Sequence, residues 1–187
     1  MTQPSTIATP TREEVQTWTI DPSHSLAEFS VRHMMVSTVK GRFTNLSGTI
    51  LFDPQNVTRS SVQAEIATQS VTTSDEQRDA HLRSADFFDA EQFPTLRFAS
   101  TRIEPVDDER VRVIGDLTIR ETTREVVIDA ELNGQGTNPW GKQVIGFSGR
   151  TSLNRKDFGL NWNVALEAGG MLVSDTIKIN LEIEATA

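Results

Sequence analysis

The sequence predicts an all-β fold, an eight-stranded antiparallel up-and-down barrel with one short helix. Two observations carry this prediction: apolar and polar residues alternate with a period of two in eight runs, and most runs are joined by short connections. No strand–helix–strand rhythm appears, which argues against a parallel α/β sheet. An open sheet of this size leaves two edges to protect, and closure into an extended, lipocalin-like barrel removes both.

Each run has one apolar side, and most runs are near ten residues long. The residues that share that side are, in chain order, Ala27, Phe29 and Val31; Phe43, then Gly48, Ile50 and Phe52; Val62, Ala64 and Ile66; Leu96 and Phe98; Val111, Val113, Gly115, Leu117 and Ile119; Val126, Ile128, Ala130 and Leu132; Ile145, Phe147, Thr151 and Leu153; and Ile177, Ile179, Leu181 and Ile183.

Two segments interrupt the alternation. Ser74 followed three residues later by Gln77 is a capping-box pattern, which predicts a helix over 75–85 with Ser74 as its N-cap. The segment 155–173 is long for a simple connection, and such segments are often lids or binding loops. We expect these two segments to plug or open the barrel.

Composition excludes several classes of function. The 18 Lys and Arg residues against 26 Asp and Glu give a net charge of −8, which disfavours nucleic-acid binding and attraction to anionic membrane surfaces. No run is long and apolar enough for a membrane-spanning helix, so stable membrane insertion is not expected. Zero Cys excludes disulfides, thiolate metal sites and cysteine nucleophiles. The polar start predicts a mobile N-terminal arm over 1–16, a single domain over 17–187 and a cytoplasmic location.

The alternation alone leaves open whether the barrel is filled or hollow. An eight-stranded barrel is just wide enough to be filled by its own side chains or to hold one small ligand. Ten-residue strands tilted by about 40° give a barrel roughly 25 Å tall, longer than a compact core needs. The inward candidates also mix Gly and Ala with Phe and Ile, which favours an elongated apolar slot.

Several motifs, in order along the chain, resemble those of the YceI-like family. Residues 18–25 (WTIDPSHS), 29–34 (FSVRHM) and 40–43 (KGRF) resemble its opening; 78–82 (RDAHL), 86–89 (DFFD) and 93–94 (FP) resemble its centre; 115–119 (GDLTI) and 173–175 (VSD) resemble its later motifs. The resemblance covers about residues 17–185. It implies a lipocalin-like barrel that binds a polyisoprenoid lipid, such as an isoprenoid quinone or a polyprenyl pyrophosphate, for sequestration, storage or transport.

The expected binding residues form three groups: the wall, the plug or mouth, and the head-group site. The wall candidates follow from the inward side of the runs. The wall candidates are Phe29, Val31, Phe43, Ile50, Phe52, Val62, Ile66, Leu96, Phe98, Leu117 and Ile128. Phe87, Phe88, Phe158 and Trp162 are candidates for the plug or mouth. His33, at the end of a strand, could bond a loop carbonyl or a head group, and Arg155 and Lys156 are the candidate cations for a pyrophosphate.

Catalysis and metal binding have little support in the sequence. His24, His33 and His81 are 9 and 48 residues apart, without the close pairs typical of zinc sites, so no metal and no catalytic residue is assigned. No nucleophile elbow or phosphate-binding loop appears, and no cofactor is expected. Two alternatives stay open: an enzyme for a small hydrophobic substrate with a His-based or metal-assisted site, and a closed structural barrel that acts through its surface, for example as a homodimer.

Overall fold

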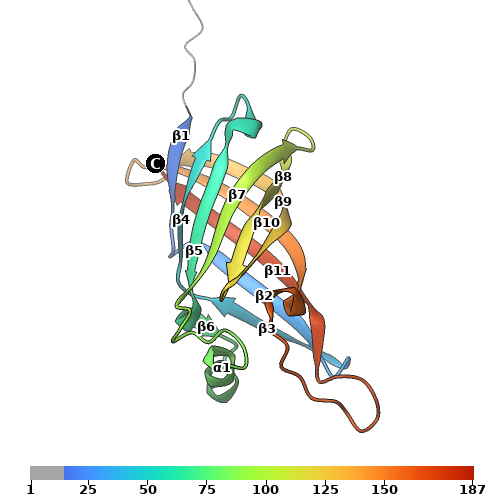
Figure 1. Cartoon of the computed structure of the whole chain (residues 1–187). Helices are drawn as coiled ribbons and strands as arrows, with labels where there is room; N and C mark the ends of the chain where they lie inside the picture. The colour runs from blue at the N-terminus through green and yellow to red at the C-terminus, as the bar shows by residue number, and fades with distance from the viewer. Residues whose placement is uncertain (1–14) are drawn as a thin grey trace, which may run out of the picture.

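The computed structural model describes residues 15–187 as one antiparallel sheet with a short helix at one end (Figure 1). The strands are β1 (Gln16–Ile20), β2 (Leu26–His33), β3 (Ser37–Phe43), β4 (Leu46–Phe52), β5 (Ser61–Ala67), β6 (Val71–Thr72), β7 (Thr95–Pro105), β8 (Arg110–Ile119), β9 (Thr122–Thr137), β10 (Gln143–Asn154) and β11 (Val173–Thr186). The helix is α1 (Glu76–Arg83), and the 3₁₀ turns are η1 (Val57–Arg59), η2 (Thr68–Ser70) and η3 (Arg155–Phe158).

The sheet closes on itself. Its order is β1-β4-β5-β7-β8-β9-β10-β11, and β1 also pairs with β11 through Thr19↔Thr186 and Ile20↔Ala185. The remaining strands extend the wall: β2 pairs with the other part of β11, β3 with β2, and β6 with β3. The predicted eight-stranded barrel is confirmed, because β1–β2, β3–β4 and β5–β6 are each one wall strand broken by a corner.

One of these corners is visible in the alternation. Phe43 and Ile50 both face inward although they are an odd number of residues apart, so the two-residue period must shift between them. The shift falls at Thr44 and Asn45, where β3 ends before β4 begins. The first wall strand starts earlier than the sequence predicts: β1 begins at Gln16, whereas residues 1–14 of the predicted arm lie outside the described residues.

The predicted helix is present but begins later and ends earlier than expected. It spans Glu76–Arg83, and its N-cap is Asp75, whose side chain accepts from the backbone N–H of Arg78. The assignment of Ser74 as N-cap was wrong. Ser74 has a φ of 62°, and a left-handed residue cannot take the extended conformation of an N-cap.

Two clusters of buried apolar side chains lie along the barrel. One surrounds Trp18 and Ile145 beside the β1–β11 closure. The other joins the wall to the segments that cover the opposite end, with Phe43, Leu96, Phe158 and Leu160 as members and Leu82 and Phe88 packed against it. Within residues 15–187, no helix combines the length and apolar character that crossing a bilayer requires.

Candidate ligand-binding cavity

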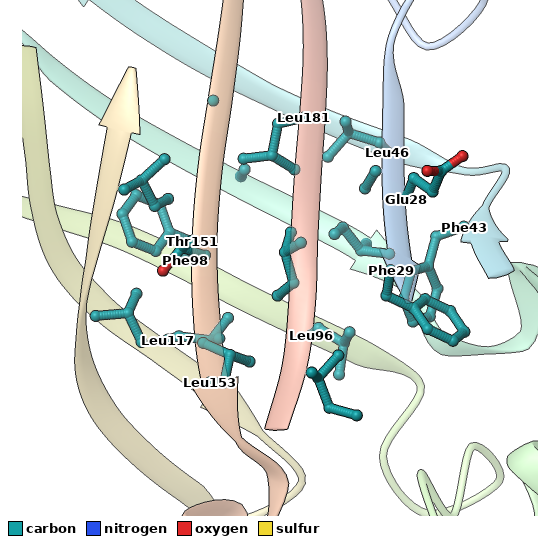
Figure 2. Close-up of a pocket in the computed structure, with 18 of the residues that line it drawn as sticks. Glu28, Phe29, Phe43, Leu46, Leu96, Phe98, Leu117, Thr151, Leu153 and Leu181 are labelled. Carbon is teal, nitrogen blue, oxygen red and sulfur yellow. The ribbon is translucent and has the colours of Figure 1, made fainter. Parts of the chain in front are cut away.

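The barrel encloses a cavity of about 780 Å³, called the lumen below. Its walls are the inward side chains of the strands, which point toward one another across the interior (Figure 2). In β11, the inward residues Ile177, Ile179 and Leu181 are only half-buried, and they alternate with exposed residues. A filled core would bury them, so their accessible surface faces the lumen rather than packed protein.

The residues predicted to contact a ligand are brought together around this lumen. All sixteen line it: Phe29, Val31, His33, Phe43, Ile50, Phe52, Val62, Ile66, Phe87, Phe88, Leu96, Phe98, Leu117, Ile128, Phe158 and Trp162. Contact with a ligand itself stays a prediction. Of the two expected head-group cations, Arg155 borders the lumen, whereas Lys156 does not.

The candidate list omits a full side of the wall. Ile177, Ile179, Leu181 and Ile183 of β11 and Val126, Ala130 and Leu132 of β9 also line the lumen. The signal that could have found them is the alternation itself, because each has the parity of the inward face of its run.

Gly41 lets an aromatic ring lie flat against the wall. A Cβ at this position would come within 2.3 Å of the Cζ atom of Phe29 on the neighbouring strand. Phe29 in turn packs against Phe43, with ring centroids 5.7 Å apart, and Phe43 packs against Phe88 at 5.5 Å. This row of rings connects the lumen wall to the segment after α1.

We call the end of the barrel where α1, the β2–β3 turn and residues 155–172 lie the helix end (Figure 1). An aromatic contact joins two of its segments: the ring of His81 on α1 lies edge-on to Trp162, 4.6 Å between centroids, and to Phe87 at 5.1 Å. Asp86 hydrogen-bonds His81 Nε2 at 2.8 Å. These contacts hold residues 159–163 over the helix end.

Asp79 ties α1 to the wall. This buried carboxylate accepts from the Thr72 hydroxyl and from the backbone N–H and hydroxyl of Thr73. Burial raises the pKa of Asp79, but these hydrogen bonds outweigh it and hold the pKa below its ordinary value. Arg78 donates to the Thr73 hydroxyl at 2.7 Å, a second contact between α1 and the end of β6.

Arg155 is committed to the protein's own backbone. Its side chain is 3% exposed, and its guanidinium donates to the carbonyls of Leu160 at 2.7 Å, Trp162 at 2.8 Å, Ser174 at 3.0 Å and Val173 at 3.4 Å. Burial lowers the pKa of Arg155, and Asp175, 3.6 Å away, opposes that shift. This geometry makes Arg155 the anchor of the 155–173 segment and does not favour the head-group role expected for it.

The two ends of the lumen differ in charge. At the helix end, the lining includes Arg32, His33, Arg78 and His81. The other end is where the turn between β7 and β8 lies (Figure 1), and its lining includes Asp107, Asp108 and Glu109. A negatively charged head group is therefore favoured at the helix end.

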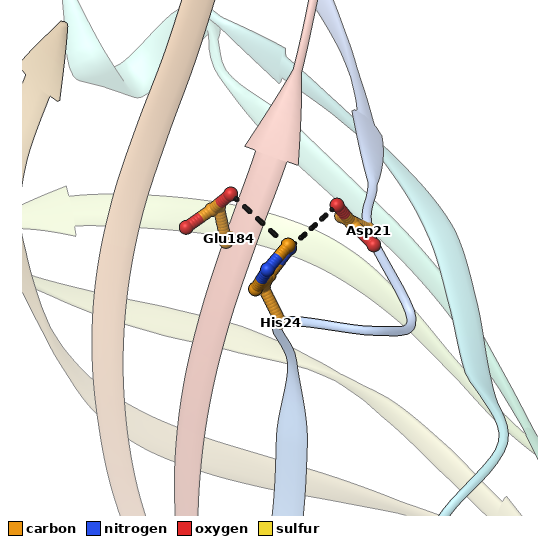
Figure 3. A group of neighbouring side chains, drawn as sticks. All are labelled: Asp21, His24 and Glu184. Atoms are coloured by element: carbon orange, nitrogen blue, oxygen red, sulfur yellow. Dashed lines mark hydrogen bonds and ion pairs between the residues drawn. The ribbon is translucent and has the colours of Figure 1, made fainter. Parts of the chain in front are cut away.

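Of the residues that the structure describes, one group of three could hold a metal ion: Asp21, His24 and Glu184 (Figure 3). His24 Nδ1 lies 2.9 Å from a carboxylate oxygen of Asp21 and 3.6 Å from one of Glu184. Hydrogen bonds from Ser23 and then from His24 lower the pKa of Asp21 to about 2, and Asp21 raises the pKa of His24. An exposed ion pair between β1–β2 and β11 accounts for this arrangement, and none of the three lines the lumen.

Comparison with known proteins places these features in a family context. Residues 18–185 match the family model of the YceI-like domain. A UPF0312 protein of Vibrio cholerae is 41% identical over 138 residues, covering 74% of this chain and 73% of that protein.

Two solved structures resemble the fold. A YceI protein of Campylobacter jejuni is 34% identical with a TM-score of 0.72, covering 83% of this chain and 89% of that one. A polyisoprenoid-binding domain from Saccharophagus degradans, implicated in plant cell wall breakdown, is 15% identical with a TM-score of 0.70 and covers 93% and 99% of the two chains.

Arg155→Met should destabilise the protein by about 2–4 kcal/mol, because it leaves buried carbonyls without their charged donor. Lys156→Met is the matched control: its exposed ion pair with Asp175 should be worth less than about 1 kcal/mol. Urea denaturation of both variants measures the difference. Equal stabilities for the two would contradict the anchoring role.

The His24 ion pair should make stability depend on pH. Because the folded-state pKa of His24 is raised above 6.5, its contribution is fully present below pH 6.5 and is lost as pH rises through the raised pKa. Because the pKa of Asp21 is lowered to about 2 from 3.8, its contribution is present above pH 3.8 and is lost as pH falls toward 2. Thermal unfolding from pH 4 to 9 should show His24→Gln less stable than wild type below pH 6.5, with the gap closing at alkaline pH. A gap independent of pH would refute this.

Proposed function

The chain belongs to the YceI-like family, and from that premise we propose that it binds one isoprenoid lipid in its lumen without converting it chemically. The proposed role is sequestration, storage or transport of an isoprenoid quinone or a polyprenyl pyrophosphate. The resemblance to a polyisoprenoid-binding domain adds support to this choice of ligand class.

The observation that carries the proposal is an elongated apolar lumen that the protein's own side chains do not fill. Aliphatic and aromatic residues from every wall strand line it, and apart from Glu28 on β2 its charged lining residues lie at its ends. Such a site matches a long hydrocarbon chain with at most one polar end.

Burial of the tail is the main source of affinity. Each buried CH₂ contributes roughly 0.8 kcal/mol, so one five-carbon isoprene unit contributes up to ~4 kcal/mol before the loss of ligand freedom is subtracted. An exposed ion pair with a head group contributes only ~0–1 kcal/mol. Tail length should therefore set the affinity, and the head group should set the orientation.

The cationic residues of the helix end support an orientation in which a phosphate or quinone head group faces α1. Arg32 and Arg78 are exposed there, and His33 reaches the lumen from the end of β2. A metal-assisted site receives no comparable support, because the candidate ligands Asp21, His24 and Glu184 lie outside the lumen. The cytoplasmic location, the absence of a cofactor and a homodimeric state stay predictions.

Filling the lumen should abolish binding. Ala130→Phe places a ring in the lumen, whereas Val127→Phe places the same ring on the exposed face of the same strand. Titration with farnesol, a three-unit prenyl alcohol, should give a Kd at least tenfold weaker for Ala130→Phe and unchanged for Val127→Phe. Solvent extraction of the wild-type protein after expression should also yield an isoprenoid. Equal affinities for the two variants would sink the proposal.

The lumen volume predicts a limit to useful tail length. At about 30 Å³ per water-sized group, 780 Å³ holds on the order of 25 carbon-sized groups, or about five isoprene units. In a series of prenyl alcohols of two to eight units, affinity should rise with each unit up to about five and then level off. Calorimetric titration checks this, and affinity independent of chain length would contradict a tail-driven site.

A further inference from the structure

We propose that the helix end docks transiently on the surface of a lipid bilayer that carries anionic head groups, and that the lipid passes between bilayer and lumen there. This inference rests on the proposed function, because it concerns how a lumen-bound lipid is exchanged. It requires no segment that crosses the bilayer.

The first observation is a cluster of exposed apolar side chains, which we call the apolar tip: Met34, Met35, Val36, Val164 and Met171. Val36 is 80% exposed and Met35 is 67% exposed. Five of the nine large exposed apolar residues in the described part of the chain belong to this tip. Scattered exposed apolar residues are ordinary, but a gathered set marks a contact surface.

The tip is one surface although it comes from distant parts of the chain. The Met34 N–H donates to the Leu172 carbonyl at 2.8 Å, and the Leu172 N–H donates to the Val164 carbonyl at 2.9 Å. Ala165 and Met171 form an isolated β-bridge. Figure 1 shows the β2–β3 turn and the loop before β11 projecting together beyond the sheet.

The turn itself is built against local preference. Met34 and Met35 have φ of 51° and 58°, a left-handed conformation that Asn and Gly adopt more readily. The Arg32 guanidinium braces the turn by donating to the Met35 carbonyl at 2.8 Å and to the Thr38 hydroxyl at 3.2 Å. Met34 is thereby left 45% exposed and Met35 67% exposed.

The lumen and the charges beside the tip indicate what covers it. His33, Ser37, Leu172 and Val173, which flank the tip in sequence, line the lumen, so the tip adjoins the lumen at the helix end. Arg32 and Arg78 line the lumen at this end and are exposed; Arg78 lies 3.9 Å from Asp75, and the exposed Glu167 lies between Val164 and Met171 in the loop. The charged residues that line the opposite end are Asp107, Asp108 and Glu109. A bilayer with anionic head groups matches both features: Met and Val side chains enter the acyl boundary, and the guanidinium groups meet phosphates.

The loop that carries Val164 and Met171 also carries Trp162, which covers the lumen at the helix end. Trp162 contacts His81 and Phe87 on the inner side, and Val164 and Met171 lie on the exposed side. Contact of the tip with a bilayer therefore acts on the segment that covers the helix end.

The test compares two double variants of the full chain by co-sedimentation with vesicles of 70% phosphatidylcholine and 30% phosphatidylglycerol. Met35→Ser with Val36→Ser removes the most exposed part of the tip. Val106→Ser with Trp140→Ser is the matched control, since these residues are also exposed apolar ones but lie outside the tip. We expect at least tenfold weaker vesicle binding for the tip variant and wild-type binding for the control. Transfer of a prenyl alcohol between vesicles should slow in parallel.

Farnesol titration without vesicles separates this proposal from the proposed function. Both double variants should bind farnesol like the wild type and keep its melting temperature. The docking proposal would be overturned if the wild-type protein bound farnesol but not vesicles, or if the two double variants bound vesicles equally. Lipid binding in the lumen would then still stand. If the wild-type protein did not bind farnesol, the proposed function would be overturned instead. If the wild-type protein bound no vesicles and formed a dimer that the tip variant did not form, the tip would be a contact surface for a second copy of the chain, and the docking proposal would be overturned.

Discussion

Closure of the wall between the first and last strands is the constraint on which the rest of the structure depends. The direct β1–β11 pairing is short, two residue pairs, yet its neighbourhood is tightly packed, with Trp18 and Ala185 fully buried. The Asp21 N–H also donates to the Glu184 carbonyl at 2.8 Å. Once the ring of hydrogen bonds is complete, the wall strands cannot collapse toward one another. The closed ring thus fixes the circumference of the wall and, with it, the width of the lumen.

Two buried charged groups fasten the covering segments to the wall at the helix end. Asp79 fastens α1 to the β6 side of the wall, and Arg155 fastens the long segment to the start of β11. Both side chains are buried and their partners belong to the protein itself. Because these polar groups are satisfied at the helix end, the wall beyond them can remain largely apolar, which is the condition for binding a hydrocarbon chain.

The helix end combines three properties that the opposite end lacks. It has the aromatic contact between His81 and Trp162, cations among the lumen-lining residues, and an exposed apolar tip. A lipid-binding barrel needs a route by which a poorly soluble ligand enters without crossing water. An end that has cations in its lining, is apolar at its rim and is covered by α1 and residues 155–172 meets that need.

The alternation of side chains determined the wall: the eight runs, their inward faces and the eleven wall candidates follow from a period of two, which is a local property of the strand. The motifs determined the family, because they appear in order along nearly the whole chain. Only the tertiary structure decided whether the barrel is hollow, since the volume inside depends on the circumference of the closed ring and not on any single residue. It also decided that Arg155 serves backbone carbonyls and that His24 meets Glu184. Those partners are brought together by packing of distant segments, which no local pattern encodes.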